Sequence, residues 1–286
     1  EPNVHALAID GNFDDCQSLL KDMFNHTAFR NAVKLSGVNS INWARIMAQV
    51  VYYFTSALSL GAPDRPVSFT VPTGNFGDVF AGYVASKMGL PIERLIVATN
   101  VNDILHRALS AGDYSTGTVT PTAAPSMDIQ VSSNFERLLF DLEGRDGVKT
   151  SARMAAFEKS HNMQLEPGMR ETAASIFTSH RVDPDDMSLA MRWAQDRAGQ
   201  IIDPHSAIGL SAAQNADLDP SVPVVTLATA HPAKFPDAVE RATGIRPSLP
   251  RRVGDLFDRE EKYTKLPGDY DAVKSFIMSN ATPTDG

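Results

Sequence analysis

The sequence predicts an α/β fold, with a mostly parallel sheet that helices cover on both faces, plus a helical insertion. Apolar runs typical of strands alternate with segments of helical periodicity, which is the pattern of parallel strands joined by helical crossovers. A block from about residue 113 to 200 lacks convincing strands, so we expect a helical insertion between two parts of one sheet. The hydrophobic fraction of 43% is sufficient for a buried core.

The composition disfavours several classes of protein. A net charge of −8 at pH 7 argues against nucleic acid or an anionic membrane as a partner, and there is no apolar run of about eighteen residues that could span a membrane. Cys16 is the only cysteine, so no intrachain disulfide forms, which fits the cytoplasm; we expect its side chain to be buried. The seven histidines show no metal-ligand spacing, so we expect no metal site.

The first part of the chain is expected to hold one strand and two helices. Residues 4–9 have a strand pattern that ends at an Asp-Gly turn, and residues 14–24 form an amphipathic helix. A longer helix covers 42–60 and ends at Gly-Ala-Pro. Because the chain opens with neither Met nor a signal peptide, directly before a strand, we expect it to be a fragment.

The remaining elements follow in strand–helix order. We expect strands at 67–71, 95–99 and 222–228. Helices are expected at 76–88, 103–111, 206–215, 235–243 and 270–279, with a mostly helical stretch from 132 to 198 and a loop at 113–127. Three of the strands run into small polar loops, at 72–78, 100–103 and 229–232. Because ligands bind outside the carboxyl ends of strands in open α/β sheets, we expect these loops to share one edge.

The loop after the strand at 67–71 has the chemistry of an anion site. Gly74 and Gly77 allow a sharp turn and close approach of a ligand to the backbone. The following helix would direct free N–H groups at the loop, and phosphate is a common ligand of such sites. The alternative is a tight strand-to-helix connection capped by Asn75 or Asp78. The spacing matches neither Gly-x-Gly-x-x-Gly nor a P-loop.

Four motifs are specific when they are taken together. They are Asn39-Ser40-Ile41-Asn42-Trp43-Ala44-Arg45, Thr73-Gly74-Asn75-Phe76-Gly77-Asp78, Ala98-Thr99-Asn100-Val101-Asn102-Asp103 and Ala228-Thr229-Ala230-His231-Pro232-Ala233-Lys234-Phe235. In order and spacing they resemble the longer, bacterial and fungal form of threonine synthase, a fold-type II pyridoxal-phosphate enzyme. The resemblance covers nearly the whole chain and is weakest between about 113 and 200.

The resemblance implies a lyase that uses pyridoxal 5'-phosphate to convert O-phospho-L-homoserine and water into L-threonine and phosphate. It implies that Thr229 meets the pyridine nitrogen and that Asp78 begins the helix; the alternative for Thr229 is a strand-end residue bonded to backbone. The cofactor phosphate would lie against the backbone N–H groups of Gly74, Asn75, Phe76 and Gly77.

The substrate is expected to meet Ser40, Asn42 and Arg45. Positions 42 and 45 share one face of a first helical turn, and a guanidinium suits phosphate or carboxylate. The alternative is that Ser40 or Asn42 caps the helix while Arg45 is solvated. We expect Asn100 and Asn102 to stabilise their turn. His205, just before a helix, is expected to orient its loop.

The Schiff-base lysine of the family lies far upstream of the Gly-rich loop, where this chain has no room for it. Neither Lys21 nor Lys34 matches its motif, so we assign no catalytic residue and expect no turnover by the chain as given. The chain would be the C-terminal portion of the enzyme: residues 1–38 the tail of a smaller domain, and 39–286 the large cofactor-binding domain. We expect a monomer or a dimer.

Two alternatives remain open. One is another fold-type II enzyme, such as a relative of cysteine synthase or threonine dehydratase, although the motifs at 74–78 and 229–235 argue against it. The other is a non-catalytic phosphate-binding module that resembles the enzyme and has lost its lysine.

Overall fold

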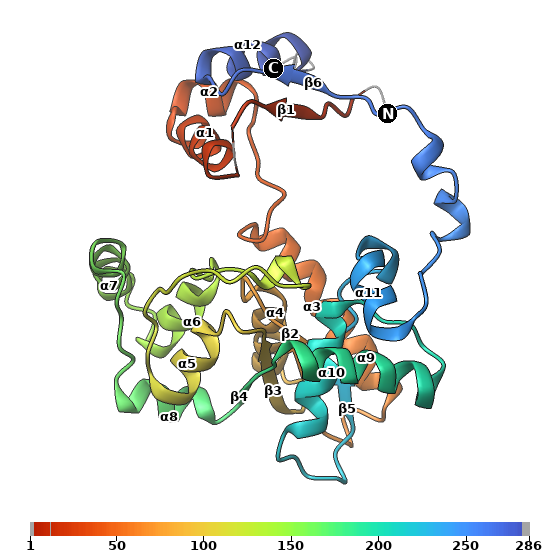
Figure 1. The fold of residues 1–286 in the computed structure, drawn as a ribbon. Coiled ribbons are helices and arrows are strands. Elements are labelled where there is room, and N and C mark those ends of the chain that lie inside the picture. Colours follow the sequence, from red (N-terminus) through yellow and green to blue (C-terminus); the bar gives the residue numbers. More distant parts are fainter. Residues whose placement is uncertain (1–2, 12, 282–286) are drawn as a thin grey trace. The chain divides into compact units, whose positions relative to one another are not determined.

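A computed structural model describes residues 3–11 and 13–281 (Figure 1). The chain divides into two compact units, one formed by Glu1–Gly37 with Pro250–Gly286 and the other by Val38–Leu249. The sequence reading placed all of 39–286 in one large domain, whereas the structure assigns the last segment to the smaller unit. The reason is strand pairing: β1 (Leu7–Ile9) and β6 (Thr264–Leu266) form a parallel pair.

The smaller unit packs three helices around a small apolar cluster. The helices are α1 (Phe13–Asn25), α2 (Thr27–Ala32) and α12 (Tyr270–Asn280). Met23, Phe29 and Val273 are buried at the centre of the cluster, and Leu19 packs against them. Cys16 is exposed, so the expectation of a buried cysteine is wrong. It lies one helical turn before Leu19 and outside this cluster.

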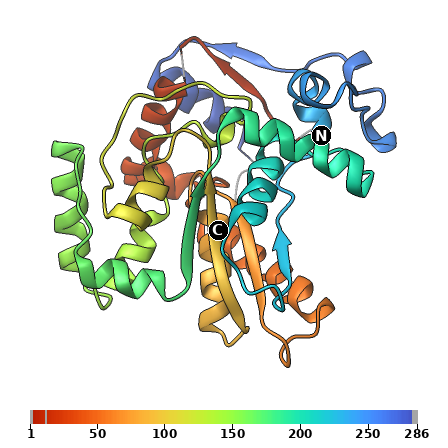
Figure 2. The same ribbon diagram turned by 60° about the horizontal axis from the view of Figure 1, so that its bottom comes forward.

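The larger unit contains a four-stranded sheet in which all neighbouring strands are parallel, and this confirms the predicted fold class (Figure 2). The strand order is β4-β3-β2-β5. The strands are β2 (Val67–Pro72), β3 (Ile92–Thr99), β4 (Phe177–Arg181) and β5 (Val224–Thr226).

The edge strand β4 corrects the expectation that the block from 113 to 200 has no strand. Its sequence is Phe-Thr-Ser-His-Arg, and only Phe177 is fully buried. An edge strand that is partly exposed needs no apolar run, because its hydrogen bonds come from the neighbouring strand. Here β3 supplies them along the whole length of β4.

Helices cover both faces of the sheet, and β3 shows the two faces clearly. Leu95 and Val97 join the apolar cluster on one face, while Ile96 and Ala98 join the cluster on the other. The first face is covered by α3 (Trp43–Ser59), α4 (Gly77–Lys87), α5 (Ile104–Ala111), α6 (Phe135–Leu142), α7 (Gly147–Ser160) and α8 (Pro167–Ala174). The second is covered by α9 (Pro184–Ala198), α10 (Pro204–Asn215) and α11 (Pro236–Thr243).

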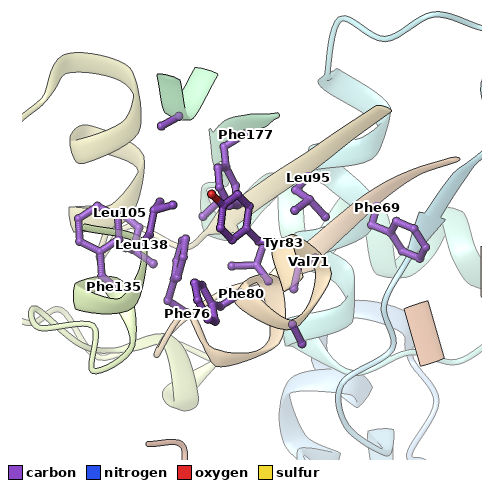
Figure 3. Close-up of a cluster of buried hydrophobic side chains, with 14 of the residues drawn as sticks. Phe69, Val71, Phe76, Phe80, Tyr83, Leu95, Leu105, Phe135, Leu138 and Phe177 are labelled. Atoms are coloured by element: carbon purple, nitrogen blue, oxygen red, sulfur yellow. The ribbon is translucent and has the colours of Figure 1, made fainter. Parts of the chain in front are cut away.

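Aromatic rings fill the core of the first face (Figure 3). Phe76 is 1% exposed, and its ring centroid lies 5.4 Å from that of Phe135 and 5.7 Å from that of Phe177. The predicted stripe of α3 is buried at Ile46, Val50, Tyr53 and Ala57. Among the described residues, no helix is long and apolar enough to cross a membrane.

Candidate functional site

A pocket of about 530 Å³ lies at the carboxyl ends of β2 and β5, where the sequence predicted a ligand site. It is lined by Ser40, Arg45, Gln49, Tyr52, Pro72, Thr73, Gly74, Asn75, Phe76, Gly77, Asp78, Leu227, Ala228 and Thr229. Every expected site residue except Asn42 is among them. The structure therefore brings together segments from three separate parts of the sequence.

The loop from β2 to α4 presents unpaired donors. Helix α4 begins at Gly77, and no side chain caps its N-terminus. Within the described residues, the backbone N–H groups of residues 74–79 donate to no protein acceptor. A helix N-terminus with free N–H groups attracts an anion through both hydrogen bonds and the helix dipole. This geometry favours the anion site over the capped connection that was the alternative.

Gly74 has no room for a side chain. A Cβ atom at this position would lie 2.6 Å from the carbonyl oxygen of Ser126. The Ser132 hydroxyl donates to the Gly74 carbonyl (2.8 Å), and the side-chain amide of Asn134 donates to the Asn75 carbonyl (2.9 Å). The segment from 126 to 134 thus packs against the loop at 74–77 and donates hydrogen bonds to the carbonyl groups of Gly74 and Asn75.

Phe76 connects the loop to the core. Its backbone has φ +62°, a left-handed conformation that is unfavourable for a bulky residue. The buried contacts of its ring with Phe135 and Phe177 offset this strain. The loop conformation is therefore determined by packing under the sheet as much as by its glycines.

Asp78 lies in the first turn of α4 and binds two tyrosines of α3. Tyr52 donates to Asp78 Oδ1, and Tyr53 donates to both Oδ1 (3.1 Å) and the backbone carbonyl (2.9 Å). Burial raises the pKa of Asp78 above its usual range, and the hydrogen bonds from the two tyrosines counteract only part of that effect. Burial therefore favours the neutral, protonated form of Asp78 beside the loop at residues 74–77.

We expect the Asp78→Asn variant to gain stability relative to the unaltered protein as the pH rises. Since the folded-state pKa of Asp78 is raised, the folded protein binds this proton more tightly than the unfolded chain. The carboxyl thus stabilises the fold below its ordinary pKa, and that contribution is lost as the pH rises through the folded-state pKa. The change amounts to about 1.4 kcal/mol for each unit of difference in pKa.

Urea unfolding at several pH values from about 4 to 8 measures this effect, because that interval begins at the ordinary carboxyl pKa. The asparagine variant has no proton to lose, so the difference in the free energy of unfolding should grow in its favour. Parallel curves for the two proteins would contradict the raised pKa.

The three expected substrate residues near the start of α3 have different roles in the structure. Asn42 is the N-cap of α3, and its side chain accepts from the Ala44 N–H (2.9 Å); it does not line the pocket. The capping alternative therefore describes Asn42. Ser40 and Arg45 do line the pocket, and the Ser40 hydroxyl lies 3.2 Å from that of Ser133.

Sequence reasoning missed Gln49 and Tyr52. They share the pocket-facing side of α3 with Arg45, at helical spacings of four and three residues. Continuing the helical spacing from Arg45 along the helix would have found them. Asn100 and Asn102 do not line the pocket; both donate to Asp128 Oδ1, at 2.7 and 2.9 Å, and so stabilise the turn and the loop beside it.

Comparisons with known proteins agree with this geometry. A family model described as "Threonine synthase, C-terminal" matches residues 206–277. A threonine synthase of Pseudomonas aeruginosa is 51% identical over 279 residues, which are 97% of this chain and 60% of that protein. The chain belongs to the threonine synthase family. It spans about three-fifths of the length of such relatives.

Solved structures of the family have the same fold. The crystal structure of pyridoxal-phosphate-bound threonine synthase from Brucella melitensis superimposes with a TM-score of 0.92 at 53% identity, covering 98% of this chain and 60% of that one. The yeast threonine synthase gives a TM-score of 0.86 at 37% identity, with the same coverage. The expected fold-type II architecture is confirmed.

Proposed function

We propose that this chain forms the cofactor-phosphate cradle and part of the substrate site of a lyase that converts O-phospho-L-homoserine and water into L-threonine and phosphate. The observation that carries the proposal is the row of unpaired N–H groups at residues 74–79, beside Thr229 in the same pocket. The single cysteine, which a reducing compartment keeps as a thiol, supports placing the reaction in the cytoplasm.

The pocket fits pyridoxal 5'-phosphate in size and donor chemistry. The backbone of Gly74, Asn75, Phe76 and Gly77 would hold the phosphate at the N-terminus of α4, where the helix dipole favours an anion; Asp78, which was expected to begin this helix, is its second residue. Thr229, which lines the same pocket, would present a neutral hydroxyl to the pyridine nitrogen. When bound, the cofactor supplies an electron-withdrawing ring that lets protons leave the carbon atoms of the substrate.

Ser40 and Arg45 would bind an anionic group of the substrate. Arg45 offers a planar, permanently charged fork that suits phosphate or carboxylate, and Ser40 offers a hydroxyl in the same pocket. Among the pocket-lining residues there is no lysine, so we propose that the lysine which carries the cofactor lies outside these 286 residues.

The first test compares pyridoxal 5'-phosphate with pyridoxal as ligands of the chain. We expect the phosphorylated form to bind at least about tenfold more tightly, since charge-assisted hydrogen bonds to the phosphate are lost in the other. Borohydride should leave no stoichiometric label on one particular lysine, beyond the scattered labelling that exposed lysines give with any aldehyde. Equal affinities for the two compounds, or a stoichiometric label on a single lysine of the chain, would contradict the proposal.

Turnover is then assayed in a chimera that joins this chain to the N-terminal part of the Pseudomonas aeruginosa relative. O-phospho-L-homoserine should yield L-threonine and phosphate in equal amounts. Arg45→Gln should raise KM about tenfold or more, because a charged hydrogen bond is lost. Arg197→Gln, on the exposed surface of α9, is the matched control. If the chimera binds the cofactor but forms no threonine, the proposed activity is wrong and the alternative of a non-catalytic phosphate-binding module is favoured.

A further inference from the structure

A buried cluster of Asp203, His205 and Ser206 lies at the start of α10, and the function proposed above makes no use of it. The three residues are 0%, 4% and 3% exposed. Asp203 is the N-cap of α10 and accepts hydrogen bonds from the backbone N–H groups of His205 (2.9 Å) and Ser206 (3.1 Å). Its carboxylate also lies 2.7 Å from His205 Nδ1 and accepts from the Ser206 hydroxyl. These bonds fix both side chains.

Each of the two side chains then bonds to a different segment: His205 to one that packs against the pocket-lining residue Gly74, and Ser206 to the pocket-lining residue Thr229. His205 Nε2 accepts the backbone N–H of Ser126 (3.2 Å), and the Ser126 carbonyl is the atom that lies against Gly74. Ser206 Oγ accepts the backbone N–H of Thr229 (3.1 Å). One carboxylate therefore positions both the segment behind the anion-binding loop and the segment that carries Thr229.

The bonding partners determine the protonation state of His205. A backbone N–H can only donate, so Nε2 must present a lone pair to Ser126. Nδ1, which faces the Asp203 carboxylate, then carries the single hydrogen, and the ring is neutral. The ring of Phe235 lies against the imidazole, with the centroids 4.7 Å apart, and fixes its plane.

Helix capping does not account for this arrangement. An N-cap aspartate needs only the backbone N–H groups that follow it. The His205 and Ser206 side chains add nothing to that cap, yet both are buried, and they bond to Ser126, which packs against the pocket-lining Gly74, and to the pocket-lining Thr229. Their common feature is therefore the pocket and not the helix.

We propose that Asp203, His205 and Ser206 are positioning residues that set the spacing between the anion-binding loop and Thr229, and thereby the affinity of the pocket for a phosphorylated pyridine. None of the three lines the pocket; they act through the backbones of Ser126 and Thr229. A binding site must be held to within a fraction of an ångström, which requires such support from behind. This inference rests on the proposed function.

Three variants test it. His205→Gln keeps an acceptor near the position of Nε2, His205→Phe keeps a ring without an acceptor, and Ser206→Ala removes the acceptor for Thr229. We expect His205→Phe and Ser206→Ala to weaken the binding of pyridoxal 5'-phosphate about tenfold, as for the loss of one buried hydrogen bond, and His205→Gln to stay within about threefold. Both His205 variants should lower Tm to a similar extent.

The proposal is overturned if His205→Phe binds like the unaltered protein, or if His205→Gln and His205→Phe lose affinity equally in step with Tm. The ¹⁵N chemical shifts of His205 are an independent check, and an Nε2–H tautomer would also overturn it. If the unaltered chain binds no cofactor, the proposed function fails. The positioning role of Asp203, His205 and Ser206 is then tested by amide hydrogen exchange. Faster exchange at Ser126 only in His205→Phe, and at Thr229 only in Ser206→Ala, supports it; any other pattern rejects it.

Discussion

Replacing Gly74 with alanine is expected to weaken the binding of pyridoxal 5'-phosphate strongly while most of the fold persists. The new Cβ would lie 2.6 Å from the Ser126 carbonyl oxygen, and a backbone atom cannot rotate away as a flexible side chain could. Overpacking of this kind costs about 1–3 kcal/mol. If the loop relieves this clash by moving, that energy corresponds to a loss of affinity of about five- to 150-fold.

Gly168→Ala provides the matched control for this prediction. Gly168 lies in α8, and no atom would come within 4 Å of an added Cβ. Alanine favours a helix over glycine by up to about 1 kcal/mol, so this variant should be equally or slightly more stable and should bind the cofactor unchanged. A titration followed by absorbance compares the two. If Gly74→Ala binds as well as Gly168→Ala, the close approach has no functional role.

Replacing Phe76 with alanine is expected to destabilise the larger unit by about 3–5 kcal/mol, as for other buried phenylalanines. The ring is 1% exposed and packs on Phe135 and Phe177 (Figure 3). Alanine removes these contacts but still carries a Cβ at φ +62°, so the backbone strain remains. The free energy of unfolding in urea measures the loss.

A glycine variant at position 76 separates the two effects. Phe76→Gly loses the same ring but relieves the left-handed strain, so it should be more stable than Phe76→Ala by about 1 kcal/mol. Met88→Ala, at the other end of α4 and 64% exposed, controls for a large side chain lost from the surface and should change stability by less than about 0.5 kcal/mol. An alanine variant as stable as the glycine variant would show that position 76 is unstrained.

The amino-acid sequence was sufficient to predict the parallel α/β architecture and the two loops that line the pocket at the ends of β2 and β5. Both depend on local signals. Buried parallel strands are apolar runs, and the residues that follow them at 72–78 and 229–232 meet at one sheet edge whatever the details of packing. The importance of Gly74 could also be predicted, because a glycine between a predicted strand and a predicted helix is identified from the sequence alone.

Features that depend on residues far away in the sequence could not be predicted from the sequence. Strand β4 is held by hydrogen bonds from β3, about eighty residues earlier, and β6 pairs with β1 at the opposite end of the chain. Cys16 is a residue type that is commonly buried, yet among the described side chains of α1 those of the apolar cluster start one turn later, at Leu19. The local periodicity of apolar residues indicates neither which strand will pair with a segment nor where an apolar cluster ends.

The same distinction applies within the site. The types of residue that bind phosphate follow from chemistry that each short motif already contains, and so they could be read along the chain. The roles of Asn42 as a helix cap and of His205 as an acceptor for Ser126 depend on which groups the fold brings within about 3 Å, a distance at which hydrogen bonds form. Such pairings arise when packing joins segments that lie far apart in the sequence, and for that reason they became visible in the folded chain.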